Sequence, residues 1–282
     1  MSLRKERETG TLFPTYRFNL IAAFCPLAGS GASLSPFRRE MVLNNFANVS
    51  HLLADVAWEA HRGMPTPYGG WPPGTLEELA MVGRSRLPLV LDACRSHRFN
   101  AIILLGGGDP GFLEARQIGS DLGVPITTCS HSQMTVAGML GRRLSMLCLS
   151  EFQSRQMAGL VAEYKMTDRC ASVRDLGFLH EAPGEASTNA IASERRAAEA
   201  SGKSRLLDLA VSHATAAVEQ DGAEAILIGY SQTFWLQPYL SQRLAALGQK
   251  VPVLEGNGCA IAQAKQMVGL GVRSSGPASP VD

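Results

Sequence analysis

Four short apolar runs, each followed by a turn of glycine or other small residues, constrain the fold of this chain most strongly. They cover residues 20–24, 101–105, 145–149 and 225–228. Continuous apolar runs of this length are typical of strands that are buried on both faces of a parallel sheet. We therefore expect each run to be a parallel strand whose carboxyl end opens into a loop.

Segments with helical periodicity separate these runs. They cover residues 76–97, 133–140, 155–164, 205–220, 235–247 and 260–268. Alternating strand and helix signals predict an α/β fold, in which helices flank mostly parallel sheets. Ligands of such sheets bind just beyond the carboxyl ends of the strands, so the turns after the apolar runs are where we look for a functional site.

The two halves of the chain carry the same theme of strand, glycine turn and helix, once around Gly106 and again around Gly229. The 282 residues are enough for two domains, each with its own core. We predict two similar lobes with an active-site cleft between them. The first consists of residues 15–127 plus 255–275 and the second of residues 128–254, with flexible termini at 1–14 and 276–282.

Two segments interrupt this alternation. Residues 64–74 are rich in proline, glycine and aromatic residues, which favours an ordered loop or lid. Trp58, His61, Tyr68 and Trp71 lie in or near this segment and could either close over a ligand or simply pack the loop. Residues 183–204 are polar and could form a surface helix or a mobile insertion.

Charge and cysteine content exclude several classes of protein. Lysine and arginine total 26 and aspartate and glutamate total 25, so a net charge of +1 offers no basis for binding nucleic acid or an anionic membrane. No apolar stretch approaches the roughly 18 residues of a membrane span, and the charged N-terminus does not resemble a secretory signal. The six cysteines are spread singly, which favours free thiols in the cytoplasm and argues against a zinc site.

A family resemblance rests on several segments that occur in order. They are AIILLGGGDPGFLEAR at 101–116, Val-Pro-Ile at 124–126, Gly-Arg-Arg-Leu-Ser at 141–145, DGAEAILIGY at 221–230, Val-Pro-Val-Leu-Glu-Gly at 251–256 and Gly-Leu-Gly-Val-Arg-Ser-Ser at 269–275. Together they resemble the aspartate/glutamate/hydantoin racemase superfamily, and hydantoin racemase in particular.

This resemblance implies two similar α/β lobes and a cofactor-free active site between them, which acts on small amino acids, ureides or dicarboxylates. In the family, two thiols face each other across the acidic carbon of the substrate, and backbone amides at the turns stabilise an enolate-like intermediate. The positions that match the two thiols are Gly106 and Tyr230 in this sequence. A racemisation that uses two thiols cannot run with these residues.

Several residues remain candidates for the site. Gly106, Gly107 and Gly108 form a turn that could bring backbone amides close to an anion. Asp109 could act on the substrate or cap the following helix. Tyr230 could donate a hydrogen bond to a carboxylate, transfer a proton or fill space.

Further candidates follow from the chemistry of the neighbouring turns. Ser231, Gln232 and Thr233 stand where we expect a helix N-terminus, which could bind an anion or simply be capped. His131 is a candidate acid or base because histidine titrates near neutral pH. Relocated thiols at Cys25, Cys129 or Cys259 are a further alternative.

We therefore expect an enzyme with altered chemistry: a cofactor-free isomerase or lyase, without a metal, that acts next to the carboxylate or carbonyl of a small acid or cyclic ureide. An inactive relative that binds such a ligand is the main alternative. A hydrolase that uses Cys129 or His131 is a third. The sequence leaves open whether the chain forms a homo-oligomer.

Overall fold

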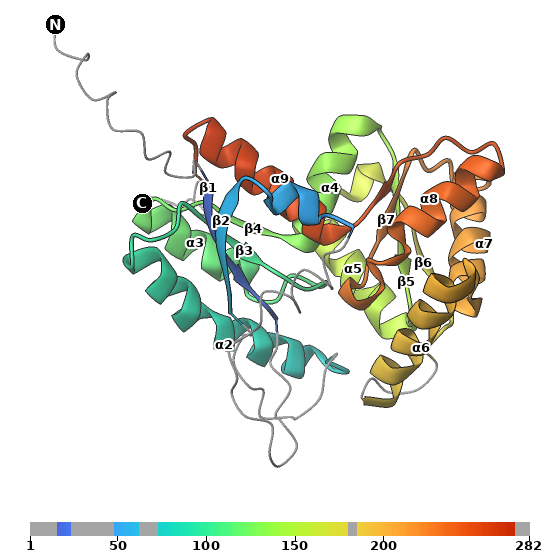
Figure 1. Ribbon diagram of the computed structural model, residues 1–282, viewed down its shortest axis with the longest axis horizontal. Coiled ribbons are helices and arrows are strands. Elements are labelled where there is room, and N and C mark those ends of the chain that lie inside the picture. Colours follow the sequence, from blue (N-terminus) through green and yellow to red (C-terminus); the bar gives the residue numbers. More distant parts are fainter. Residues whose placement is uncertain (1–15, 24–47, 62–72, 180–184, 274–282) are drawn as a thin grey trace, which may run out of the picture.

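The computed structural model describes residues 16–23, 48–61, 73–179 and 185–273 of the chain. These residues form two four-stranded sheets that lie side by side, each flanked by helices (Figure 1). Every strand pairing within the two sheets is parallel. The α/β fold with two similar lobes, expected from the sequence, is confirmed.

The first sheet has the strand order β2-β1-β3-β4. Its strands are β1 (Tyr16–Ile21), β2 (Val56–His61), β3 (Ala101–Leu104) and β4 (Ile126–Thr128). Because side chains alternate between the faces of a strand, Ile102 and Leu104 of β3 join one apolar cluster and Ala101 and Ile103 join another. The helices α2 (Leu76–Arg95) and α3 (Phe112–Leu122) cover the first face, and α9 (Gly256–Gly269) covers the second.

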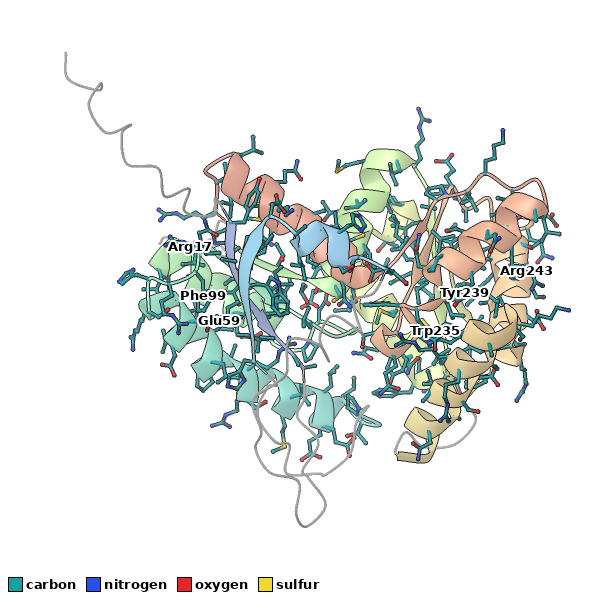
Figure 2. All side chains as sticks on the ribbon, viewed as in Figure 1. Arg17, Glu59, Phe99, Trp235, Tyr239 and Arg243 are labelled. Atoms are coloured by element: carbon teal, nitrogen blue, oxygen red, sulfur yellow. The ribbon has the colours of Figure 1, made fainter. Side chains whose placement is uncertain are left out.

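The second sheet has the order β6-β5-β7-β8, which repeats the order of the first sheet element for element. Its strands are β5 (Leu144–Cys148), β6 (Cys170–Asp175), β7 (Ala225–Ile228) and β8 (Val253–Leu254). The helices α4 (Cys129–Leu140) and α5 (Glu151–Glu163) cover one face, and α7 (Arg205–Glu219) and α8 (Leu236–Ala246) cover the other. At the start of α8, Trp235 and Tyr239 pack edge to face, with ring centroids 6.1 Å apart (Figure 2).

Helices α4 and α9 join the two halves of the molecule. Helix α4 leads from β4 of the first sheet to β5 of the second, and α9 follows β8 back to the first sheet. Two hydrogen bonds tie this region together: Ser132 Oγ lies 2.6 Å from Gln263 Oε1, and the Thr127 hydroxyl donates to the carbonyl oxygen of Ala260 at 3.0 Å. These bonds fix α9 against the end of β4 and the first turn of α4.

The sequence placed most elements correctly but missed the edges of the sheets. Strand β1 begins four residues before the apolar run at 20–24 and overlaps its first two residues, and the edge strands β2 and β6 were not predicted. Helix α4 begins at Cys129 and not at residue 133. The polar stretch at 183–204 contains a helix, α6 (Glu185–Ser201), whose Ile191 and Ala198 are buried against the second core.

Short 3-10 turns complete the described elements: η1 (Ser50–Leu53), η2 (Thr167–Arg169) and η3 (Ser231–Thr233). Most of the segment 64–74, with Tyr68 and Trp71, and both termini lie outside the described residues. Trp58 is buried in the core of the first sheet, whereas His61 is exposed. Within the described ranges, no helix is long and apolar enough to cross a membrane.

Candidate active site

Two turns, one from each sheet, meet between the two lobes. The first turn, residues 106–108, follows β3, and the second turn, Gly229 and Tyr230, follows β7, the equivalent strand of the other sheet. A β-carbon added to Gly107 would lie 2.8 Å from the carbonyl oxygen of Gly229. Only glycine allows the two turns to approach this closely.

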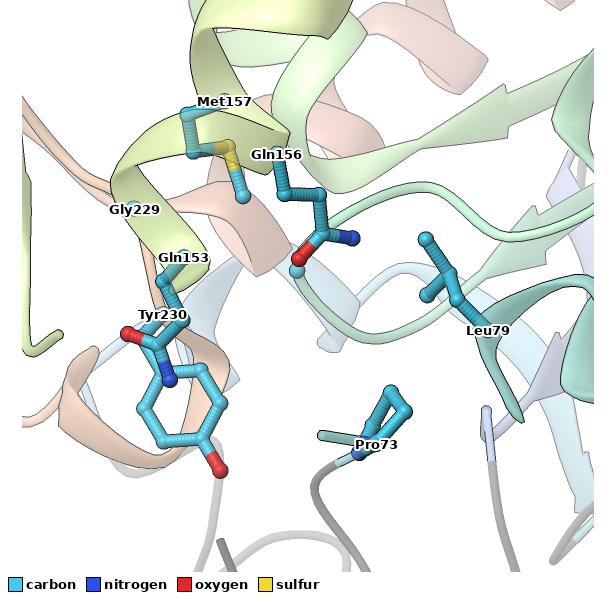
Figure 3. Close-up of a pocket in the computed structure, with 8 residues that line it drawn as sticks. Pro73, Leu79, Gln153, Gln156, Met157, Gly229 and Tyr230 are labelled. Carbon is cyan, nitrogen blue, oxygen red and sulfur yellow. The ribbon is translucent and has the colours of Figure 1, made fainter. Parts of the chain in front are cut away.

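A small pocket, partly open to solvent, lies beside this contact. Its lining comes from both turns, from α5 and from the start of α2 (Figure 3). The lining residues are Pro73, Leu79, Gly107, Gln153, Gln156, Met157, Gly229 and Tyr230. The pocket therefore lies at the carboxyl ends of strands, where ligands of α/β sheets bind.

Tyr230 brings the phenol of the second turn to this pocket. Its side chain is only 5 % exposed, and its hydroxyl has no hydrogen-bond partner among the described residues. Burial raises the pKa of the phenol, so the group stays protonated at neutral pH. A buried hydroxyl normally finds a partner, so this donor is available to a ligand.

Two glutamines of α5 supply amide groups that the sequence analysis did not identify. Gln153 accepts a hydrogen bond from the backbone N–H of Leu149 at 3.0 Å, and Gln156 donates from Nε2 to the carbonyl oxygen of Gly108 at 3.3 Å. Both line the pocket (Figure 3). Their position in the first two turns of a helix that follows β5 is the signal that could have revealed them, because that end of the helix faces the site.

Asp109 holds the first turn in place from behind the pocket. Its carboxylate accepts hydrogen bonds from the backbone N–H groups of Ser130 (2.9 Å) and His131 (2.8 Å), and from the hydroxyls of Thr128 (2.9 Å) and Tyr164 (3.0 Å). The expectation that it caps the following helix was wrong, because it caps α4 and the N-cap of α3 is Gly111. Asp109 is buried and does not belong to the pocket lining.

His131 lies in the first turn of α4, next to Asp109 and away from the pocket lining. Its ring packs against Phe112 and Tyr164, with centroids 5.1 and 4.9 Å apart. Burial lowers the pKa of the imidazole, although Asp109 opposes this shift. The ring is therefore neutral at neutral pH and sits in an aromatic environment.

The remaining predicted residues of the two turns shape the backbone beside the pocket. Gly106 and Gly108 have φ angles of 111° and 81°, in the region that disfavours residues with a side chain, so a cysteine at position 106 would be strained. Ser231, Gln232 and Thr233 form only the short turn η3, and the predicted helix N-terminus is wrong because α8 begins at Leu236. The Thr233 hydroxyl donates to the carbonyl oxygen of Tyr230 at 2.7 Å and so fixes the second turn.

No cysteine belongs to the described lining of the pocket. Cys129 is completely buried, and burial raises the pKa of its thiol well above the ordinary value. Burial likewise raises the pKa of Cys148, behind Gly229, and of Cys259 to about 12 each. Cys25 lies outside the described residues.

Titratable residues do not gather into a metal centre in the described part of the chain, where no group of three histidine, cysteine, aspartate or glutamate side chains could hold an ion. Among the described residues, the pocket lining contains one titratable side chain, Tyr230, together with two amides, apolar side chains and backbone groups. This set can donate hydrogen bonds to a carbonyl or carboxylate oxygen. It contains no carboxylate, imidazole, amine or thiol that could remove a proton.

The same arrangement of two sheets occurs in known racemase-fold structures. Allantoin racemase from Klebsiella pneumoniae is 20 % identical, with a TM-score of 0.66 over 92 % of this chain and 90 % of the other. Allantoin racemase from Pseudomonas fluorescens is also 20 % identical, with a TM-score of 0.67 over 92 % and 93 %. A glycine-to-cysteine mutant of arylmalonate decarboxylase in a sulfate-associated form is 18 % identical, with a TM-score of 0.54 over 90 % and 93 %.

These likenesses show a shared fold. Among curated proteins, none matches the sequence. The family comparison is more specific, because residues 75–264, which include both turns and the whole of α5, match the sequence pattern of Asp/Glu/Hydantoin racemase. The chain therefore belongs to the Asp/Glu/Hydantoin racemase family.

Proposed function

We propose that this protein is a cofactor-free enzyme that acts on the carbon next to the carboxylate or carbonyl of a small acid or cyclic ureide, through chemistry that does not use a pair of thiols. Membership in a family of racemases and isomerases supports an enzyme. A reaction through an enolate-like intermediate suits a pocket built from turns and hydrogen-bond donors.

The observation that carries the proposal is the Tyr230 hydroxyl, buried at the pocket without a partner among the described residues. An enolate carries its negative charge on the former carbonyl oxygen. A neutral phenol stabilises that charge by donating a hydrogen bond, and the raised pKa of Tyr230 keeps the proton on the phenol. The tyrosine would therefore stabilise the intermediate and not remove a proton.

The make-up of the lining favours a lyase over a racemase. A racemase must take a proton from one face of the substrate, and the described lining offers no base for this step. In the decarboxylation of a malonate, the bond to one carboxylate breaks, carbon dioxide leaves and the electron pair stays behind as the enolate. A proton from water then completes the product, so no protein base is needed.

A second function is supported by the same lack of acid–base groups. A relative that binds a small carboxylate or ureide without converting it needs only the donors that the lining supplies. Such a protein would be stabilised by its ligand by about 1.4 kcal/mol when the free ligand is at ten times its dissociation constant.

For either function, we expect a cytoplasmic protein, because the five described cysteines are free thiols.

A thermal-shift panel of aryl and alkyl malonates, hydantoins, allantoin, aspartate and glutamate tests the proposal. Each compound that stabilises the protein is then incubated with it in D₂O and followed by NMR. Decarboxylation of at least one malonate is the expected result, whereas exchange of the hydrogen next to the carbonyl would show an enzyme with a base outside the described lining. Stabilisation without any conversion would replace the enzyme with the binding protein.

A further inference from the structure

Arg86 of α2 is the largest fully buried side chain of the described residues, with an exposed fraction of 0 %. Burying a guanidinium is costly unless its charge is paired and its N–H groups are hydrogen-bonded. Within the described ranges its donors reach backbone oxygens, namely those of Ile21 at 2.8 Å, Leu105 at 2.9 Å and Pro110 at 3.2 Å. Its Nε has no partner among the described residues.

The guanidinium therefore forms no salt bridge in the described part of the chain, although the buried Asp109 attracts its positive charge. The Asp109 oxygens accept hydrogen bonds from Thr128, Ser130, His131 and Tyr164, and none is recorded from Arg86. Burial lowers the pKa of the guanidinium to about 10, so it remains charged at neutral pH. A buried cation of this kind attracts any anion that enters the same region.

The three bonded oxygens place this charge at the edge of the site. Ile21 ends β1, Leu105 immediately precedes the first turn and Pro110 closely follows it. Since β1 and β3 are neighbours whose connections leave in opposite directions, their carboxyl ends form the crevice where α/β sheets bind ligands. Arg86 connects the two strand ends at this crevice, because it donates hydrogen bonds to the carbonyl oxygens of both Ile21 and Leu105.

On helix α2, Arg86 lies on the same face as two further residues that contact the site, Leu79 and Gly83. Leu79 lines the pocket, and Gly83 lies against Gly111 so closely that a β-carbon on Gly83 would stand 2.7 Å from the Gly111 nitrogen. Leu79, Gly83 and Arg86 have the spacing of one helix face. Successive helical turns of α2 therefore contact the pocket through Leu79, Gly111 through Gly83, and the strand ends through Arg86.

We propose that Arg86 is a positioning residue that holds the first turn at the pocket, and that its buried charge makes the pocket select anionic ligands over neutral ones. The inference rests on the proposed function, because it concerns the same pocket. It narrows the substrate class to carboxylates, such as malonates, over uncharged ureides. Stabilisation of an anionic intermediate by the same charge is a direct consequence.

Calorimetric titration with malonate, a dianion, and with hydantoin, which is uncharged at neutral pH, tests this role. The proteins are the wild type, Arg86→Met, Arg86→Lys and the control Arg84→Met, which removes an exposed arginine from the same helix. We expect Arg86→Met to weaken malonate binding at least about tenfold and hydantoin binding less than about threefold. The control leaves both affinities unchanged.

The lysine variant separates charge from structure. Lysine keeps the charge but lacks the planar fork that reaches three oxygens, so we expect it to keep the preference for malonate while both affinities fall. This comparison also decides the matter if Arg86→Met does not fold. A preference that disappears in Arg86→Lys, an equal loss of both ligands in Arg86→Met, or a wild type that does not bind malonate would each overturn the proposal.

Failure of the proposed function has a different signature. If malonate binds in an Arg86-dependent way but no malonate is converted, the charge has the role proposed here and the protein is a binding protein. If the wild type and Arg86→Met convert a ligand at the same rate, the protein is an enzyme as proposed, and the proposed role of Arg86 is wrong.

Discussion

Gly107 and Gly229 bring the two halves of the molecule into backbone contact: a β-carbon at position 107 would lie 2.8 Å from the Gly229 carbonyl oxygen and 3.5 Å from Cα of Tyr230. The first turn and the second turn are therefore set against each other at the wall of the pocket. Their separation therefore determines where the Tyr230 phenol lies at the pocket.

Gly107→Ala is expected to push the two turns apart. Overpacking of a close backbone contact costs about 1–3 kcal/mol, and the displaced turn should weaken binding of the ligand found in the screen. Urea unfolding measures the loss of stability, and calorimetric titration measures the loss of ligand affinity. Gly159→Ala is the matched control, because Gly159 lies in α5 with nothing within 4 Å of its added β-carbon. If Gly107→Ala is as stable and as active as this control, the contact between the turns has no role.

Asp109→Asn is expected to destabilise the protein by about 1–3 kcal/mol, because an amide nitrogen would face groups that donate hydrogen bonds to the carboxylate. The loosened first turn should also lower activity, although Asp109 does not line the pocket. Urea unfolding of this variant is compared with that of Asp121→Asn, an exposed site whose partner is Gln117. Equal free energies of unfolding would show that the cap on α4 contributes nothing.

Glu255 is expected to make the stability of the protein depend on pH. Its buried carboxylate accepts the backbone N–H groups of Asn257 and Gly258 at the start of α9, yet burial raises its pKa to about 7. Between the ordinary pKa of 4.5 and about 7, the folded state keeps a proton that the unfolded state has lost, so the contribution to stability is full below this window and is lost as the pH rises through it.

Urea unfolding at several pH values checks this expectation. The free energy of unfolding of the wild type should contain a component that falls between about pH 4.5 and 7, and Glu255→Gln should lack that component. A wild type and a variant with parallel profiles across the window would show that Glu255 titrates normally.

The fold could be predicted because its signals are local. The apolar run of β7 is buried on both faces and ends at a glycine, so the run at 225–228 predicted the bounds of this strand correctly. The edge strands were missed for the converse reason: β6 is only half-buried along its whole length, so its sequence, CASVRD, carries no apolar pattern.

The site could be predicted only in part, because it depends on contacts between distant segments. The turns around Gly107 and Tyr230 were found because each follows an apolar run. The roles of Gln153 and Gln156 depend on how α5 packs beside the other lobe, and the burial of Arg86 depends on the approach of α2 to the strand ends. His131 was a reasonable candidate from its type alone, but its place beside Phe112 and Tyr164 is a property of the tertiary structure.

The most direct test of the central claim measures conversion of the substrate found in the screen by the wild type, by Tyr230→Phe, and by Cys25→Ala and Cys129→Ala. The tyrosine variant removes one hydroxyl from the pocket wall. We predict that it lowers the rate about 10²-fold, as expected for the loss of a donor to an oxyanion, while both cysteine variants keep the wild-type rate. A cysteine variant that loses activity while Tyr230→Phe keeps it would contradict the account and assign the chemistry to a thiol.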